Sequence, residues 1–286
     1  MSRLTRPVST SALAGAMAAL LLAACSGTQP TSEPASEGQE AVHAVHWGYE
    51  ADNGPDEWGS MDSDWILCAE GREQSPVDLA NAAKIDLPQV AIHMPSDQDV
   101  EVMNQEGVID ALDNGHTIQI NTRGTERMSV GDQTYALVQF HFHAPSEHTL
   151  DGEHFPMEMH LVHQAEDDSL AVVGVLVEEG AENPGIAPLW EQLPRGSGTE
   201  TTLQIPAEFA EQLFSGDPTG VFHYRGSLTT PPCSEGVSWY VRRTPTQLSK
   251  DQIAAFTAVY DHNNRPVQAL NDRTLSLDEK PLVTAN

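Results

Sequence analysis

Residues 139–148, QFHFHAPSEH, decide the fold class of this chain and the nature of its site. In a β-strand, successive side chains point to opposite faces of the sheet, so Gln139, His141 and His143 share one face. The two phenylalanines between them share the other face and can be buried in a core. We therefore expect a strand that is packed on one side and presents imidazoles on the other.

The stretch MEMHL, seventeen residues further on, repeats this pattern and places Glu158 and His160 on one face. Three imidazoles, those of His141, His143 and His160, can then converge from two strands. Three protein ligands that leave a fourth position for water are the arrangement of a catalytic zinc site. Gln139 and Glu158 each stand two residues before a candidate ligand, where either can accept a hydrogen bond from its second ring nitrogen. The pattern predicts a zinc centre.

A cupin barrel is the rival interpretation of the first stretch. His141, His143 and Glu147 have the spacing of a first cupin box, in which the glutamate is a ligand and the metal is iron or manganese. A second box with a Gly-Pro turn and a fourth histidine is then required downstream. Residues 169–185 contain no histidine, and the next one, His223, precedes RGSLTTPP. Residues 141–147 therefore match a first cupin box, but the chain downstream lacks the second box that a cupin requires.

Apolar segments in the rest of the chain are short and strand-like, and turn residues separate them. They are VEVMN, HTIQINT, YALVQFHFH, MEMHLVHQ, SLAVVGVLVEE and GVSWYVRR. The clearest helical spacing is in residues 248–261, with Ser249 as N-cap, and residues 188–193 suggest a short helical turn. The chain is predicted to be mainly β (α+β), a single domain with short peripheral helices.

Acidic residues dominate the charge of the 286-residue chain. It has 42 acidic and 14 basic residues and a net charge of -28. Nucleic acids and anionic lipid surfaces would be repelled, so neither is an expected partner. The excess is typical of a solvated acidic coat, and the small number of lysines raises the alternative of adaptation to high salt.

The N-terminal segment is predicted to be a targeting signal. Residues 1–24 contain two early arginines and an apolar run too short to span a membrane comfortably. Cys25 follows Leu-Ala-Ala, which resembles a bacterial lipobox, so we expect a lipoprotein signal peptide and a lipid-modified Cys25. An ordinary signal peptide is the alternative. Residues 25–44 are rich in Ser, Pro and Glu and predict a flexible linker before a domain at 45–286.

The remaining cysteines can form one disulfide. Lipidation of Cys25 leaves Cys68 and Cys233, and an exported protein folds in an oxidising compartment. Two free thiols remain the alternative, because the sequence alone does not show that the two are close in space.

From residue 46 to about residue 273 the chain resembles the α-class carbonic anhydrases. The resemblance is carried by short blocks in the family's order: HWGY (46–49), QSPVD (74–78), NGH (114–116), QFHFH with SEHT, EMHLVH, GSLTTPP (226–232) and NNRPVQ (263–268). It implies one domain around a large, twisted, mostly antiparallel sheet, with zinc at the bottom of a conical cleft. The implied reaction is reversible hydration of CO2 to bicarbonate and a proton by a zinc-bound hydroxide.

Residue roles follow from the same resemblance. His141, His143 and His160 match the zinc ligands. Glu147 matches the glutamate that accepts a hydrogen bond from the threonine hydroxyl, here Thr229, which in turn accepts one from the hydroxide. Independently of the resemblance, His163 would point to the opposite face from His160, so it is expected to be structural, as is His148 next to Glu147. Cys68 and Cys233 fall where exported members carry their disulfide.

By the same resemblance, His116 matches the family's proton shuttle. Histidine suits that role because its unperturbed pKa near 6.5 allows proton transfer around neutrality. Asp113 stands where fast members often carry asparagine, and its charge is expected to raise the pKa of His116. The residues expected to hold the ligands or order water are Gln139, Glu158, Tyr49, Asn114 and Asn263. The residues expected to line an apolar CO2 pocket are Val162, Val172, Leu228, Thr230, Val237 and Trp239.

The expected cofactor is Zn2+ and the expected partners are CO2 and bicarbonate. The protein would be lipid-anchored to the bacterial cell envelope and face the periplasm, with no membrane contact beyond the anchor. The sequence does not decide between a monomer and a homodimer. A non-catalytic zinc-binding lipoprotein on the same scaffold is the alternative function.

Overall fold

In a computed structural model of the chain, the structure describes residues 45–93, 108–122, 127–194, 196–204, 214 and 216–285. Residues 44–286 form one compact unit. The predicted signal peptide (1–24), the lipid-modified Cys25 and the linker (25–44) lie outside the described residues and stay predictions. Within the described ranges, no helix is long and apolar enough to cross a membrane.

The strands are β1 (Ala83–Lys84), β2 (Val90–His93), β3 (Val108–Asp113), β4 (Ile118–Asn121), β5 (Arg127–Val130), β6 (Gln133–His143), β7 (Thr149–Leu150), β8 (Glu153–His154), β9 (Met157–Gln164), β10 (Leu170–Glu179), β11 (Glu200–Gln204), β12 (Thr219–Ser227), β13 (Glu235–Leu248), β14 (Ser276–Pro281) and β15 (Val283–Ala285). The helices are α1 (Trp58–Met61), α2 (Leu67–Glu70), α4 (Ala187–Trp190) and α6 (Lys250–Thr257), with a 3-10 turn η1 (Ser63–Trp65).

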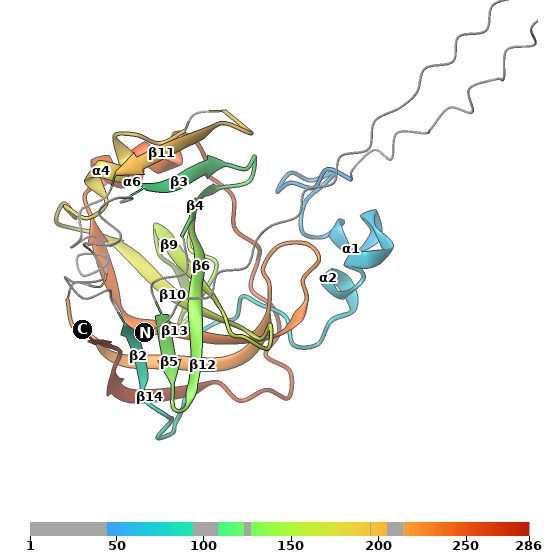
Figure 1. The fold of residues 1–286 in the computed structure, drawn as a ribbon. Coiled ribbons are helices and arrows are strands. Elements are labelled where there is room, and N and C mark those ends of the chain that lie inside the picture. Colours follow the sequence, from blue (N-terminus) through green and yellow to red (C-terminus); the bar gives the residue numbers. More distant parts are fainter. Residues whose placement is uncertain are drawn as a thin grey trace, which may run out of the picture. The chain divides into compact units, whose positions relative to one another are not determined.

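Thirteen strands of the described residues form one sheet, with the path β1-β14-β12-β13-β10-β9-β6-β4-β3-β11. Strands β5, β2 and β15 branch from β6 in that order. Neighbours are antiparallel except in the pairs β1–β14, β10–β13 and β2–β15. The short helices lie at the periphery, α1 and α2 on one side and α4 and α6 near β11 (Figure 1). The predicted fold class is therefore confirmed.

Strand β10 is buried on both faces, which explains its unbroken apolar sequence. Val173 and Val175 belong to the larger core cluster, whereas Val172 and Leu176 belong to a second cluster. Side chains of alternating residues point to opposite sides of the sheet, so the sheet separates two cores.

A register shift in β6 sets the face that its histidines occupy. Tyr135 and Leu137 are buried in the larger core, and so are the two phenylalanines that follow at even positions. The shift lies between Leu137 and Gln139 in the pairing with β9, and Val138 at this point is 42% exposed. Because one extra residue inverts the alternation, the phenylalanines return to the core and the histidines take the other face.

Helices α4 and α6 cover the phenylalanine face of β6. The ring of Phe142 lies 4.9 Å from Trp190 and 5.8 Å from Phe256, measured between centroids. Helix α6 begins with a capping box in which Ser249 and Gln252 exchange hydrogen bonds, as its predicted N-cap requires. The helix is shorter than the predicted span of 248–261.

Cys68 and Cys233 form the predicted disulfide, with their Cα atoms 5.1 Å apart and a sequence separation of 165. The bond links α2 to the loop between β12 and β13, which carries Thr229. Both cysteines are buried against Trp58. A cross-link outside the sheet therefore holds this loop.

We expect the double variant Cys68→Ser/Cys233→Ser to lose about 5 kcal/mol of unfolding free energy, because a loop of this length greatly restricts the unfolded chain. Urea unfolding of the oxidised protein and of the variant measures the difference. Cys25→Ser is the matched control and should leave the midpoint unchanged. A double variant with the parental midpoint would contradict a stabilising role.

Candidate metal centre

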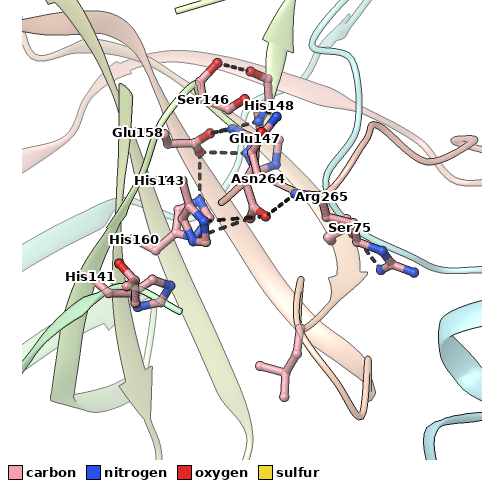
Figure 2. Close-up of polar contacts among 12 residues, drawn as sticks. Ser75, His141, His143, Ser146, Glu147, His148, Glu158, His160, Asn264 and Arg265 are labelled. Atoms are coloured by element: carbon pink, nitrogen blue, oxygen red, sulfur yellow. Dashed lines mark hydrogen bonds and ion pairs between the residues drawn. The ribbon is translucent and has the colours of Figure 1, made fainter. Parts of the chain in front are cut away.

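Three histidines converge where β6 and β9 pair. The antiparallel register places His141 directly opposite His160, and His143 follows on the same face of β6. The three ring centroids lie between 4.7 and 5.3 Å apart. One ring nitrogen of each lies within 4.8 Å of the others. Figure 2 shows the rings gathered beside Glu147 and Glu158.

The Nδ1 atoms of the two β6 histidines are already engaged. His141 Nδ1 lies 2.8 Å from Gln139 Oε1, and His143 Nδ1 lies 2.6 Å from the backbone oxygen of Asn263. Both acceptors favour the tautomer with the proton on Nδ1, which leaves each Nε2 with its lone pair. The contact of Gln139 with His141 Nδ1 agrees with the role predicted for Gln139, which is to accept a hydrogen bond from a candidate ligand.

Glu158 holds the third histidine. Its Oε1 lies 3.0 Å from His160 Nε2, so Nδ1 is the nitrogen of His160 that remains for the triad. Burial tends to raise the pKa of Glu158, but His148 and His160 hold it well below its usual range. Burial tends to lower the pKa of His160, and Glu158 raises it. A proton and a metal cation therefore compete for Nδ1 of His160, and the negative charge of Glu158 favours the binding of either one.

The residues present fit a metal ion. His143 Nε2 is buried and has no hydrogen-bond partner, a costly state that a cation at the triad would remove. Burial, reinforced by the neighbouring imidazoles, lowers the pKa of His141 well below its usual value, and burial lowers that of His143. Both rings are then neutral and can coordinate. Three imidazoles with an open fourth position suit zinc.

Behind Glu158 lies a hydrogen-bonded chain that we did not expect from the sequence. His148 Nδ1 lies 2.7 Å from Glu158 Oε1, and its Nε2 lies 2.7 Å from the Tyr224 hydroxyl. That hydroxyl is hydrogen-bonded in turn to the Ser75 hydroxyl at 2.9 Å. The backbone N–H groups of Glu147 and His148 donate to Glu158 Oε2. The structural role of His148 is thus to orient the carboxylate that holds His160.

Glu147 is buried between the histidines but offers no ligand atom to the triad. Its Oε1 accepts from the backbone N–H of Arg265 at 2.9 Å, and its Oε2 has no hydrogen-bond partner. Thr229 and Glu147 are both described residues, and the hydrogen bond expected between them is not formed in this structure. One buried acceptor therefore remains available for the Thr229 hydroxyl. A cupin-type site, with Glu147 as a ligand, is not what the geometry shows.

Arg265 is a buried residue whose role we did not predict. Its guanidinium donates to Gln74 Oε1 and to the backbone oxygens of Ser75 and Cys68, each at 2.9 Å. Burial lowers its pKa to about 10, so it remains charged near neutral pH. It connects the disulfide region to Glu147. The sequence shows Arg265 in the NNRPVQ block, but no local pattern predicts that its side chain is buried.

His116 lies in a tight turn beside aromatic rings. Its ring stacks on Trp47 at 3.6 Å between centroids and lies 5.7 Å from His46. Asn114 Oδ1 accepts from the backbone N–H groups of His116 and Thr117, both at 2.9 Å, so Asn114 shapes the turn. Burial, and then His46, lowers the pKa of His116.

The expected effect of Asp113 on His116 is wrong. Asp113 is buried, and its carboxylate accepts hydrogen bonds from the Tyr260 hydroxyl and the backbone N–H groups of Gly115 and Gly196. These donors satisfy its charge within the loop. The pKa of His116 is lowered, where we expected it to be raised.

Asn263 ties the end of β6 to the turn of His116. Its side chain accepts from the backbone N–H of Ala144 at 2.8 Å and donates to the backbone oxygens of His116 and Phe142 at 3.0 Å. With its own backbone oxygen on His143, this one residue positions both a candidate ligand and the candidate shuttle.

Tyr49 has a buried hydroxyl without a hydrogen-bond partner. Burial, followed by the Glu147 carboxylate, raises the pKa of Tyr49 well above its usual value. A phenol that stays protonated near this carboxylate is consistent with the ordering of water, which remains a prediction.

The residues predicted to line an apolar pocket pack together. Val172, Val237 and Trp239 are buried in the second core cluster, with Val162 and Leu228 against it. The Trp239 ring lies 4.8 Å from the His160 ring. Thr230 is partly exposed on the neighbouring loop. An apolar surface thus borders the triad, although its role in holding substrate stays a prediction.

Comparisons with known proteins agree with this geometry. A model of the eukaryotic-type carbonic anhydrase family matches residues 53–279. A carbonic anhydrase of Pectobacterium carotovorum is 40% identical over 238 residues, which are 82% of this chain and 92% of that protein. The α-carbonic anhydrase of Thermovibrio ammonificans, solved with sulfanilamide, is 38% identical and superposes with a TM-score of 0.74 over 82% of this chain and 99% of its own. This chain belongs to the eukaryotic-type carbonic anhydrase family.

Proposed function

We propose that this protein is a zinc-dependent carbonic anhydrase that converts CO2 and water reversibly to bicarbonate and a proton. The observation that carries the proposal is the histidine triad. Its three rings converge, each has its other nitrogen beside a fixed oxygen, and His143 Nε2 is buried without a partner. When bound, zinc supplies the Lewis acid that makes water a nucleophile near neutral pH.

The residues around the triad orient the reactants. Glu147 Oε2 is the buried acceptor to which the Thr229 hydroxyl would donate, leaving the oxygen of Thr229 to accept a hydrogen bond from the attacking water. CO2 has no hydrogen-bond donor, so the apolar side chains of Val172 and Trp239 can bind it without an unsatisfied polar group. His116, neutral because its pKa is lowered, can accept the released proton.

Stopped-flow CO2 hydration by the zinc-loaded full chain is the direct test. We expect fast hydration with about one zinc per chain, and loss of both in His143→Ala, because that ring supplies one of three ligands. His262→Ala is the matched control, since its exposed side chain lies outside the triad. Stoichiometric zinc without hydration would contradict the enzyme and favour a zinc-binding lipoprotein. Bound iron or manganese in place of zinc would reopen the cupin interpretation.

Glu158→Gln should weaken zinc binding by about 10- to 100-fold, because a neutral amide holds His160 less firmly than a buried carboxylate. Competition with a chelator measures the affinity, and circular dichroism shows that the variant is folded at the same temperature. Glu153→Gln changes an exposed carboxylate on β8 and should keep the parental affinity. Equal affinities in the two folded variants would contradict the role of Glu158.

We further propose that the protein is an exported lipoprotein whose catalytic domain, residues 45–286, faces the periplasm. The motif before Cys25 supports lipidation, and the buried disulfide suits an oxidising compartment. In a bacterial host, Cys25→Ser should move the protein from the membrane fraction to a soluble one, and Cys68→Ser should not. A Cys25→Ser protein that stays with the membranes would contradict the anchor.

A further inference from the structure

A cavity of about 440 Å³ lies beside β12 and β14, away from the triad. Its lining includes three arginines, Arg72, Arg225 and Arg273, together with His223 and Tyr224. Three of the seven arginines in the part of the chain that the structure describes are therefore gathered at one place. In a chain with 14 basic residues and a net charge of -28, such a gathering requires a reason.

Carboxylates neutralise these arginines poorly. Arg72 lies 4.0 Å from Asp272, and both side chains are exposed, so this pair contributes little. Among the described residues, Arg225 and Arg273 form no ion pair within 4.0 Å. Glu73 also lines the cavity, while the nearby Glu235 accepts hydrogen bonds from the Glu73 backbone and from a neighbouring glutamine. Glu73 and Glu235 act on Arg273 only through longer-range electrostatics. The lining carries three guanidinium groups against the two carboxylates of Glu73 and Asp272, and this excess of positive charge attracts an anion.

Arg273 is held rigidly in place. Its guanidinium donates to the backbone oxygens of Leu270, Arg225 and Ala269 at 2.8 to 2.9 Å. It also lies over the Tyr224 ring, 5.6 Å from the centroid. These contacts are to neutral groups, so they fix the position of the charge without cancelling it. A charge held in advance binds an anion at a lower entropic cost.

His223 adds an acceptor to the same cavity. Its Nδ1 donates to the backbone oxygen of Trp239 at 2.8 Å, and its ring stacks on Tyr240 at 4.6 Å between centroids. Burial, and then Arg225, lowers the pKa of His223, so the ring is neutral and its Nε2 carries a lone pair. Arg225 donates one N–H to Ser238 and keeps other guanidinium donors. The cavity thus combines cationic donors with one neutral acceptor.

We propose that this cavity binds a small oxyanion that still carries a proton, the chemistry shared by bicarbonate and dihydrogen phosphate. Arg72 and Arg225 would donate hydrogen bonds to its charged oxygens, and the fixed guanidinium of Arg273 would add to the positive electrostatic potential in the cavity. His223 Nε2 would accept from its O–H group. An anion without a proton, such as sulfate, lacks that last bond and binds less well.

This cavity is distinct from the metal centre. The Tyr224 ring lines it, and the Tyr224 hydroxyl is hydrogen-bonded to His148, which contacts Glu158. The contacts of Tyr224, His148 and Glu158 thus lead from the cavity lining to His160, which does not itself line the cavity. Anion binding here needs no hydration activity, so it can be present or absent whatever the triad does.

Calorimetric titration of the zinc-loaded full chain with phosphate, bicarbonate and sulfate at constant ionic strength tests the proposal, and the same titrations of His143→Ala report the binding that does not involve the triad. Arg72→Gln/Arg225→Gln should bind phosphate and bicarbonate at least about tenfold more weakly, since two charge-assisted hydrogen bonds are lost. Arg127→Gln/Arg243→Gln is the matched control, because it removes the same charge from exposed arginines that do not line the cavity. Arg273 is left intact because its backbone contacts hold the loop.

Unchanged affinity in the control double variant, with weaker binding in the cavity double variant, would support the site. Whichever of phosphate and bicarbonate binds more tightly would then be identified as its ligand. Equal weakening in both double variants would mean a general charge effect and would overturn the proposal. So would a parental protein that binds none of the oxyanions, or one that binds sulfate as tightly as phosphate.

Discussion

The antiparallel register between β6 and β9 is the constraint on which the site depends. It sets His141 opposite His160 and His143 opposite Glu158, so all three candidate ligands and the carboxylate that holds His160 lie in two pairs on the same face of the sheet. A slip of one residue would turn all these side chains into the core, because strand side chains alternate. The phenylalanine face of β6, packed under α4 and α6, resists that slip. Core packing on one side of the sheet therefore secures chemistry on the other.

The charges buried around the triad need a further cation. Glu147 and Glu158 are both buried, and Glu158 stays ionised because its pKa is held low. Arg265 is the buried cation nearby, and its charge acts on Glu147, but its guanidinium hydrogen bonds go to Gln74 and backbone oxygens. One guanidinium does not balance two carboxylates. Buried carboxylates without compensating charge are expensive. A divalent ion at the three histidines would balance them, which agrees with the orphaned nitrogen of His143.

Features that depend on local alternation could be predicted from the sequence, and features that depend on distant contacts could not. The shared face of His141 and His143, the N-cap at Ser249 and the β-rich class all follow from residues within a few positions. The contact of Asn263 with His143 joins residues 120 positions apart, and nothing near either one signals it. The bulge at Val138 was equally hidden, because its cause is packing on both sides of the sheet. Asp113 misled us since a sequence shows a charge but not the donors that satisfy it.

The loop of Thr229 shows how a distant cross-link can serve the site. Cys233 is bonded to Cys68, its backbone oxygen accepts from Gln74, and its backbone N–H donates to Thr230. On the other side of Thr229, the backbone of Leu228 donates to Ser234. The backbone on both sides of Thr229 is thus held by hydrogen bonds and by the disulfide. A hydroxyl on a fixed backbone loses little entropy when it pairs, so the disulfide would favour the predicted pairing of Thr229 with Glu147 as well as the fold.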